Sequence, residues 1–101
     1  MKLRYTPEAI QNLREIQNYI RKTLKNPQAA ARIGKMILDS CSQLKKYPMS
    51  GLSLEEKTGY GTDLRMLVCE NYLAIYKIGE NEISVTRIID GRQDYISDLF
   101  D

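Results

Sequence analysis

Histidine is absent from this chain of 101 residues, and cysteine occurs only twice. Because histidine and closely spaced cysteines are the usual zinc ligands, we expect no metal site, and no motif in the sequence suggests a cofactor. Cys41 and Cys69 are expected to be reduced residues that pack in the interior.

Long apolar runs are also missing. No stretch approaches the roughly 20 residues that a membrane span needs, and the first residues, M-K-L-R-Y-T-P-E, contain no hydrophobic signal segment. The length suits one domain, which we take as residues 1–101. We therefore expect a cytoplasmic protein without a membrane partner.

Charge is distributed unevenly, although the net charge is only +2. Residues 1–46 carry ten Lys and Arg against three acidic residues, a net of +7, whereas residues 47–101 carry five against ten, a net of −5. Most of the lysines in the first half are expected to be solvated on helix faces. The alternative is a basic surface that attracts an acidic partner.

Two helices are predicted in the basic half. Thr6-Pro7-Glu8 and Asn26-Pro27 each combine a capping side chain with a proline suited to the first helical turn. Apolar residues then recur at steps of three and four, which places them on one side of each helix. They are Ile10, Leu13, Ile16, Ile20 and Leu24 in the first helix, and Ala30, Ile33, Ile37, Cys41 and Leu44 in the second. The tight connection between them predicts an antiparallel hairpin.

Strands are predicted at residues 2–5, 63–69, 72–78 and 82–89, with a loop at 51–61 and a closing helical turn at 96–100. This order, β-α-α-β-β-β-α, predicts an α+β fold in which the hairpin packs on one face of a mainly antiparallel sheet. The last strand is nearly continuous in apolar residues, which favours an interior position. The opposite face is then free to present Arg65 and Arg87 to a partner. By alternation, Arg87 is expected to share its strand face with Ile83, Val85 and Ile89.

Five short motifs occur in order along the chain. They are Y-T-P-E-A at 5–9, P-x-x-G at 48–51, L-R at 64–65, Y-L-x-I-Y at 72–76 and R-I-I-x-G-R-x-D at 87–94. With these motifs the whole chain resembles the RelE/ParE superfamily of bacterial toxins. The resemblance implies a RelE/ParE-like fold and a plasmid-stabilisation type of toxin–antitoxin pair. It also implies a cognate antitoxin that neutralises this chain and supplies the sequence-specific DNA binding.

The superfamily divides by target. RelE-like members cut messenger RNA in the ribosomal A site, and ParE-like members poison DNA gyrase. RelE-like nucleases typically carry arginine, a second basic residue, and tyrosine or histidine at positions where this chain has Leu73, Gln93 and Leu99. The resemblance therefore favours a ParE-like toxin without catalytic residues, which uses Arg65, Arg87 and Arg92 to bind its target.

Two alternatives stay open. In a ribosome-dependent nuclease, Arg65, Arg87 and Arg92 would hold phosphate, and Tyr95 or Asp94 would move a proton. In a degenerate member, only antitoxin binding would remain. Simple packing is the competing interpretation for each residue; Arg92 and Asp94, for example, can form an ordinary ion pair at a helix start.

All three hypotheses share an antitoxin site. We expect a groove between the hairpin and the sheet to bind an amphipathic antitoxin segment that becomes ordered on binding. The residues expected to contribute are Leu13, Ile20, Leu24 and Leu67.

Overall fold

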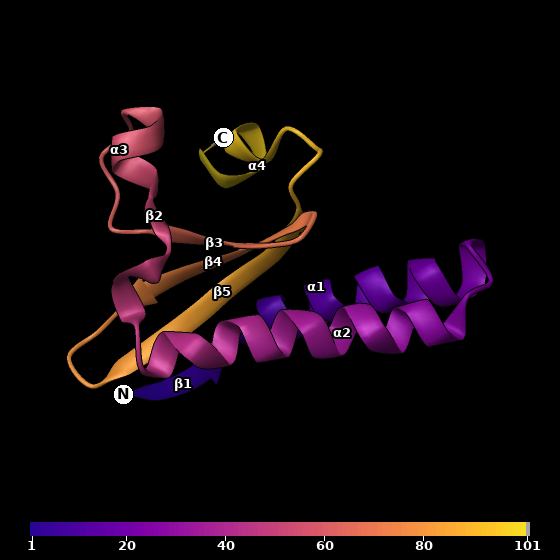
Figure 1. Ribbon diagram of the computed structural model, residues 1–101. Helices are drawn as coiled ribbons and strands as arrows, with labels where there is room; N and C mark the ends of the chain where they lie inside the picture. The colour runs from indigo at the N-terminus through magenta and orange to yellow at the C-terminus, as the bar shows by residue number, and fades with distance from the viewer. Residues whose placement is uncertain (101) are drawn as a thin grey trace.

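The computed structural model describes residues 1–100, and its centre is a five-stranded sheet with the order β1-β5-β4-β3-β2 (Figure 1). β1 runs parallel to β5, and all other neighbouring strands are antiparallel. The predicted α+β class is confirmed, as is the interior position of the last strand. The strands span Lys2–Tyr5 (β1), Leu52–Ser53 (β2), Arg65–Cys69 (β3), Tyr72–Ile78 (β4) and Glu82–Asp90 (β5).

The predicted helical hairpin is present. α1 (Pro7–Asn18) continues into a π-helical turn, η1 (Tyr19–Thr23), and α2 (Pro27–Ser42) returns beside it and ends in a 3₁₀ turn, η2 (Gln43–Lys45). Both caps form as expected, because the Ala9 N–H donates to Thr6 Oγ1 at 3.2 Å and the Ala29 N–H donates to Asn26 Oδ1 at 3.0 Å. The hairpin extends past the end of the sheet, so its tip stands clear of the strands (Figure 1).

One face of the sheet, which we call the first face, packs against this hairpin. Its core contains both cysteines, which are free and buried, and this confirms their assignment as packing residues. Leu24 and Ile10 differ from the prediction, because they are 57% and 42% exposed. The buried residues of this core are Ala9, Ile20, Ala30, Ile33, Ile37, Cys41, Leu44, Cys69, Ala74, Tyr76, Ile83, Val85 and Ile88.

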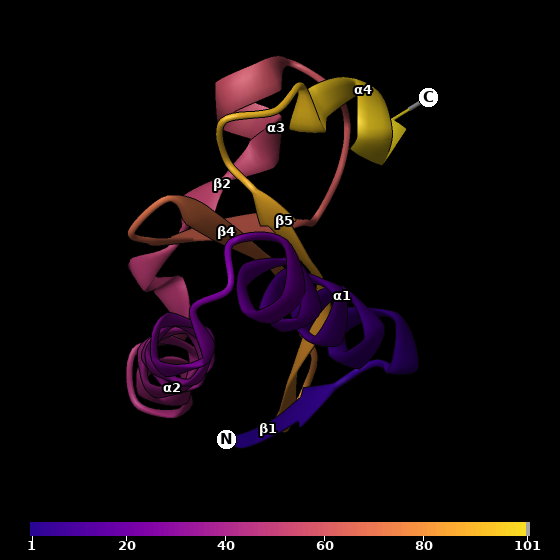
Figure 2. The same cartoon turned by 90° about the vertical axis from the view of Figure 1, so that its right-hand side faces the viewer.

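The opposite face, the second face, is covered as well, which corrects the expectation that it is free. α3 (Leu54–Thr58) and α4 (Tyr95–Phe100) lie on the side of the sheet away from the hairpin (Figures 1 and 2). Beneath them is a second apolar cluster. Its buried members are Leu54, Met66, Leu73 and Ile75, and Leu64, Ile89, Tyr95, Leu99 and Phe100 pack against it.

The segment expected to be a loop, residues 51–61, contains β2 and α3, so that prediction is wrong. A 3₁₀ turn, η3 (Pro48–Ser50), precedes them. The helix α3 begins where Ser53 Oγ accepts the Glu56 N–H at 3.3 Å and ends at Gly59, which has a φ of 80°. Ser53-x-x-Glu56 is a capping-box sequence and Gly59 is a typical helix stop, so the signal was present in the sequence.

A β-bulge in β5 decides which face Arg87 occupies. Tyr76 pairs with Val85 and Ile75 pairs with Arg87, so Thr86 is the extra residue, and its hydroxyl donates to the Ile75 carbonyl at 3.2 Å. Because the bulge reverses the alternation, Arg87 shares the second face with Ile89. The expectation that it shares a face with Ile83 and Val85 is wrong.

Candidate functional site

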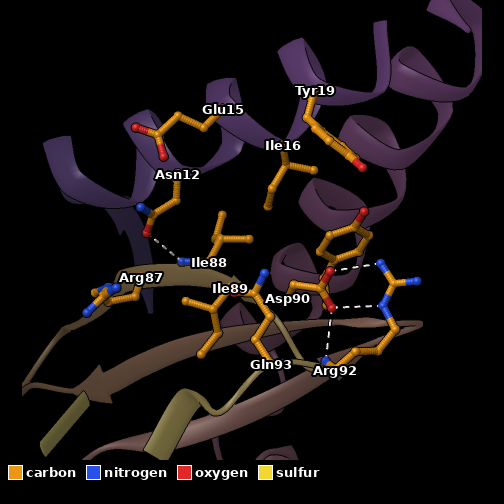
Figure 3. Close-up of a pocket in the computed structure, with 11 residues that line it drawn as sticks. Asn12, Glu15, Ile16, Tyr19, Arg87, Ile88, Ile89, Asp90, Arg92 and Gln93 are labelled. Atoms are coloured by element: carbon orange, nitrogen blue, oxygen red, sulfur yellow. Dashed lines mark hydrogen bonds and ion pairs between the residues drawn. The ribbon is translucent and has the colours of Figure 1, made fainter. Parts of the chain in front are cut away.

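A groove of about 490 Å³ lies between the hairpin and the far end of β5 (Figure 3). Asn12, Glu15, Ile16 and Tyr19 line it from the hairpin side. The sheet side contributes Tyr72, Arg87, Ile88, Ile89, Asp90, Arg92 and Gln93. A groove between hairpin and sheet was expected from the sequence, but most of the residues that line it were not.

The groove exists because the edge of β5 changes partners. β1 pairs with β5 only as far as Val85, and Thr6 then bonds the next groups: its N–H donates to Val85 O and its hydroxyl donates to Thr86 O, both at 3.0 Å. Beyond this point α1 replaces the strand, and Asn12 Oδ1 accepts the Ile88 N–H at 3.0 Å. A helix side chain thus satisfies a strand donor that has no neighbouring strand.

Arg92 and Asp90 form the most strongly paired charges of the groove. The guanidinium donates twice to the carboxylate, from Nε at 2.9 Å and from Nη2 at 2.8 Å, and the Arg92 backbone N–H adds a third bond at 2.9 Å (Figure 3). The side-chain bonds from Arg92 are the main cause that lowers the pKa of Asp90. The expected pair between Arg92 and Asp94 does not form, because Asp94 Oδ1 instead accepts the Ser97 N–H at the start of α4, at 3.3 Å.

Two tyrosines line the groove with this ion pair. Tyr19 is 57% exposed on η1 (Figure 3), and Tyr72 starts β4. Burial is the main cause that raises the pKa of Tyr72, and the neighbouring Asp90 charge adds to it. Tyr19 and Tyr72 offer hydroxyl groups for hydrogen bonds and rings for apolar contacts.

Arg87 lies at the other end of the groove with a weaker partner. Its Nε is 3.4 Å from Glu8 Oε1, an ion-pair distance, and makes no hydrogen bond within residues 1–100. The side chain is 27% exposed. Of the three arginines predicted to bind the target, Arg87 and Arg92 thus share one groove and both reach solvent.

Arg65 lies elsewhere, on the first face, where it pairs with Tyr76. Its Nη2 donates to the carbonyls of Gly51 at 2.6 Å and Met49 at 3.3 Å. Tyr76 fixes the same turn, because its hydroxyl accepts the Gly51 N–H at 3.0 Å and donates to Pro48 O at 2.7 Å. These bonds give Arg65 a structural role, and its contact with a target stays a prediction.

The remaining candidate residues do not gather at one surface. Leu13 and Leu67 pack against the first-face core, Ile20 is buried in it, and Leu24 is exposed at the hairpin tip. Tyr95 packs against the second-face cluster rather than lining the groove. Contact between the antitoxin and these leucines and isoleucine stays a prediction, as does proton transfer by Tyr95.

Three positions distinguish this chain from RelE-like nucleases, which typically carry basic residues or a tyrosine or histidine there. Leu73 is buried among Leu54, Met66 and Ile75, and Leu99 packs against that cluster. Gln93 lines the groove. Among the side chains that the structure describes, no group of three or more acidic or cysteine residues is arranged to hold a metal ion. None of the described helices is long and apolar enough to cross a membrane.

Two groove residues, Asn12 and Tyr72, were hard to predict from sequence patterns. Asn12 looks like an ordinary polar position of α1, and its role depends on where β1 ends beside β5. Tyr72 alternates with the buried Tyr76 and so resembles a core residue, but it lies at the end of the strand where the groove opens.

The fold is that of a known class of protein. A chain of the solved "Chromosomal ParDE TA system from P. aeruginosa" superimposes with a TM-score of 0.75, covering 89% of this chain and 95% of that chain at 22% sequence identity. Residues 3–95 match the family described as "ParE toxin of type II toxin-antitoxin system, parDE". No curated protein sequence matches the chain significantly. The chain belongs to the ParE toxin family, and this membership implies an antitoxin partner.

Proposed function

We propose that this chain inhibits growth by binding DNA gyrase in the cytoplasm, without cutting RNA, and that its cognate antitoxin neutralises it. The observation that carries the proposal is the apolar second face. Leu73, which replaces the arginine typical of RelE-like nucleases, is only 6% exposed and packs with Leu54, Met66 and Ile75.

Cleavage of RNA through its 2′-hydroxyl needs a base, an acid and cations around one phosphate. On the second face, apolar side chains fill the space in which such groups would meet, and a charge placed among them without a partner would be costly. The chain has no histidine. Arg65 is bonded to the Pro48–Ser50 turn region on the opposite face, so it is separated from Arg87 by the sheet.

The groove supports the antitoxin part of the proposal. Ile16 and Ile88 supply apolar contacts, while Tyr19, Tyr72 and Arg92 supply hydroxyl and guanidinium groups at its edge. An amphipathic segment that becomes ordered on binding needs this combination of apolar floor and polar rim.

A gyrase assay tests the target. Purified toxin is expected to block supercoiling and to accumulate cleaved DNA complexes, and Arg92→Ala is expected to weaken both effects. Lys57→Ala, at an exposed position of α3 away from the groove, is the matched control. Normal supercoiling at saturating toxin would reject gyrase as the target.

A ribosome assay tests the absence of RNA cleavage. Primer extension on translating ribosomes is expected to show no cuts in the A site with the wild-type chain. Cuts that disappear in Arg87→Ala would instead establish the nuclease.

Induced expression that leaves growth unaffected would support a chain that only binds its antitoxin.

A further inference from the structure

The tip of the helical hairpin is rich in basic side chains. Residues 16–38 contain five Lys and Arg and no Asp or Glu. Arg32 and Lys35, nearer the body of the protein, are paired with Glu70 at 3.4 Å and with Asp39 at 2.6 Å. Within the described chain, Arg21, Lys22 and Lys25 have no acidic partner, and Arg21 donates only to Asn18 Oδ1, at 2.8 Å.

Apolar surface is exposed among these charges. Tyr19 and Leu24 are each 57% exposed, although both belong to a hairpin whose other apolar residues mostly face the core. The tip extends beyond the end of the sheet (Figure 1), and Tyr19, at its base, also lines the groove. Exposed tyrosine and leucine side chains beside unpaired guanidinium and ammonium groups offer a protein partner both apolar and charged contacts.

The backbone of the tip is also unusual. Tyr19–Thr23 forms a π-helical turn, and Lys25 has a φ of 53°, a left-handed conformation in which glycine is favoured. The turn is held by bonds from the Leu24 N–H to Tyr19 O and from the Asn26 N–H to Ile20 O, at 3.2 and 3.1 Å. π-Helical turns and left-handed non-glycine residues occur frequently at functional sites.

We propose that this tip, defined by Tyr19, Arg21, Lys22, Leu24 and Lys25, docks on an acidic protein surface of the toxin's target. This inference rests on the proposed toxin function and adds the surface that performs it. Charge complementarity identifies the partner as acidic, and the exposed leucine and tyrosine require an apolar contact within the same patch.

A protein partner fits the charges better than a nucleic acid does. Residues 47–101 carry a net charge of −5, so a long polyanion that crossed the molecule would be repelled by the sheet half. A protein patch of limited extent can contact the tip alone. The tip also adjoins the groove through Tyr19, so an antitoxin segment bound there would hinder the approach of the target.

The test reverses two charges at the tip, in Lys22→Glu/Lys25→Glu, and compares them with Lys45→Glu/Lys46→Glu at the other end of the hairpin. All four lysines are exposed, so both variants are expected to fold, and their melting temperatures verify this. The tip variant is expected to bind purified gyrase at least about tenfold more weakly and with a smaller salt dependence. The control is expected to match the wild type, and Leu24→Ser is expected to weaken binding without changing the salt dependence.

Growth arrest after induced expression separates this inference from the proposed target. If the wild type arrests growth without affecting gyrase, and the tip variant does not arrest growth, the target is wrong and the tip surface is right. Equal arrest by the tip and control variants overturns the inference. So does a tip variant that retains gyrase binding but loses affinity for a random-sequence DNA duplex, because that result assigns the tip to nucleic acid.

Discussion

Two long helices cover the first face of the sheet, whereas two short helices of five and six residues cover the second. The first-face core joins buried residues from α1, η1, α2, η2 and three strands, while the second-face cluster has only four buried members. The first face therefore supplies most of the apolar burial that stabilises the fold. The second face contributes less burial, but its apolar side chains include Leu73 and Leu99, which occupy two of the positions that distinguish this chain from a nuclease.

The largest effect is expected at the centre of the first face. Ile37 is fully buried, so Ile37→Ala should lower the free energy of unfolding by about 3 kcal/mol through lost burial and a residual cavity. Leu38→Ala, at the adjacent and 42% exposed position, should change it by less than about 1 kcal/mol. Urea unfolding followed by circular dichroism measures both variants, and similar losses would contradict the assigned orientation of α2.

Tyr76→Phe tests the polar anchor of the first face. The substitution leaves the Gly51 N–H and the Pro48 carbonyl without their buried partner, and it should cost about 2 kcal/mol. Tyr47→Phe changes an exposed tyrosine of the same turn and serves as the control. A neutral Tyr76→Phe would show that the turn is held by Arg65 alone.

The second face should respond more weakly. Leu99 is half-buried on a six-residue helix, so Leu99→Ala should cost about 1 kcal/mol. Amide hydrogen exchange should be faster in α4 than in α2, because few buried contacts hold the shorter helix. A loss as large as that of Ile37→Ala, or equal exchange in both helices, would show that the two faces are equivalent.

The smallest effect is expected at the groove, where the first face ends. The folded protein lowers the pKa of Asp90, so the ionised carboxylate stabilises the fold above the ordinary pKa of about 4. This contribution is lost as the pH falls through the lower, folded-state pKa. Asp90→Asn should therefore be less stable than the wild type at neutral pH and equally stable at strongly acid pH.

Thermal melts of the two proteins across this pH range measure the difference. Glu80→Gln, at an exposed turn position, is the control for loss of one negative charge. A difference between wild type and Asp90→Asn that persists at acid pH would assign the effect to packing instead.

Local sequence patterns predicted where the helices and strands lie better than they predicted which side chains each of them contacts. The caps at Thr6 and Asn26, the helical hairpin and the interior β5 followed from composition and spacing. The bulge at Thr86 did not, because it depends on how β4 and β5 align, and this reversed the face predicted for Arg87. α3 was missed although Ser53, Glu56 and Gly59 marked its ends, since five residues are too few for a recognisable apolar period.

For the same reason, only part of the candidate site could be predicted from the sequence. Arg87 and Arg92 are close in sequence and line the same groove, but the separation of Arg65 depends on the antiparallel register of β3 with β4. No pattern along the chain shows that the carbonyl groups of Met49 and Gly51 accept hydrogen bonds from the Arg65 guanidinium.

The anchored turn explains why a side chain added at Gly51 of the P-x-x-G motif would clash with its surroundings. Gly51 has φ −80° and ψ 165°, which any amino acid can adopt, so glycine is required there for its size alone. A methyl group at this position would lie 2.5 Å from the Tyr76 hydroxyl, 2.7 Å from its ring and 2.8 Å from the Met66 carbonyl. Removing the hydroxyl by evolution or design would leave the ring and the carbonyl in place. Position 51 therefore cannot vary by a compensating change at Tyr76, and the P-x-x-G signature records a steric limit set by the sheet beneath it.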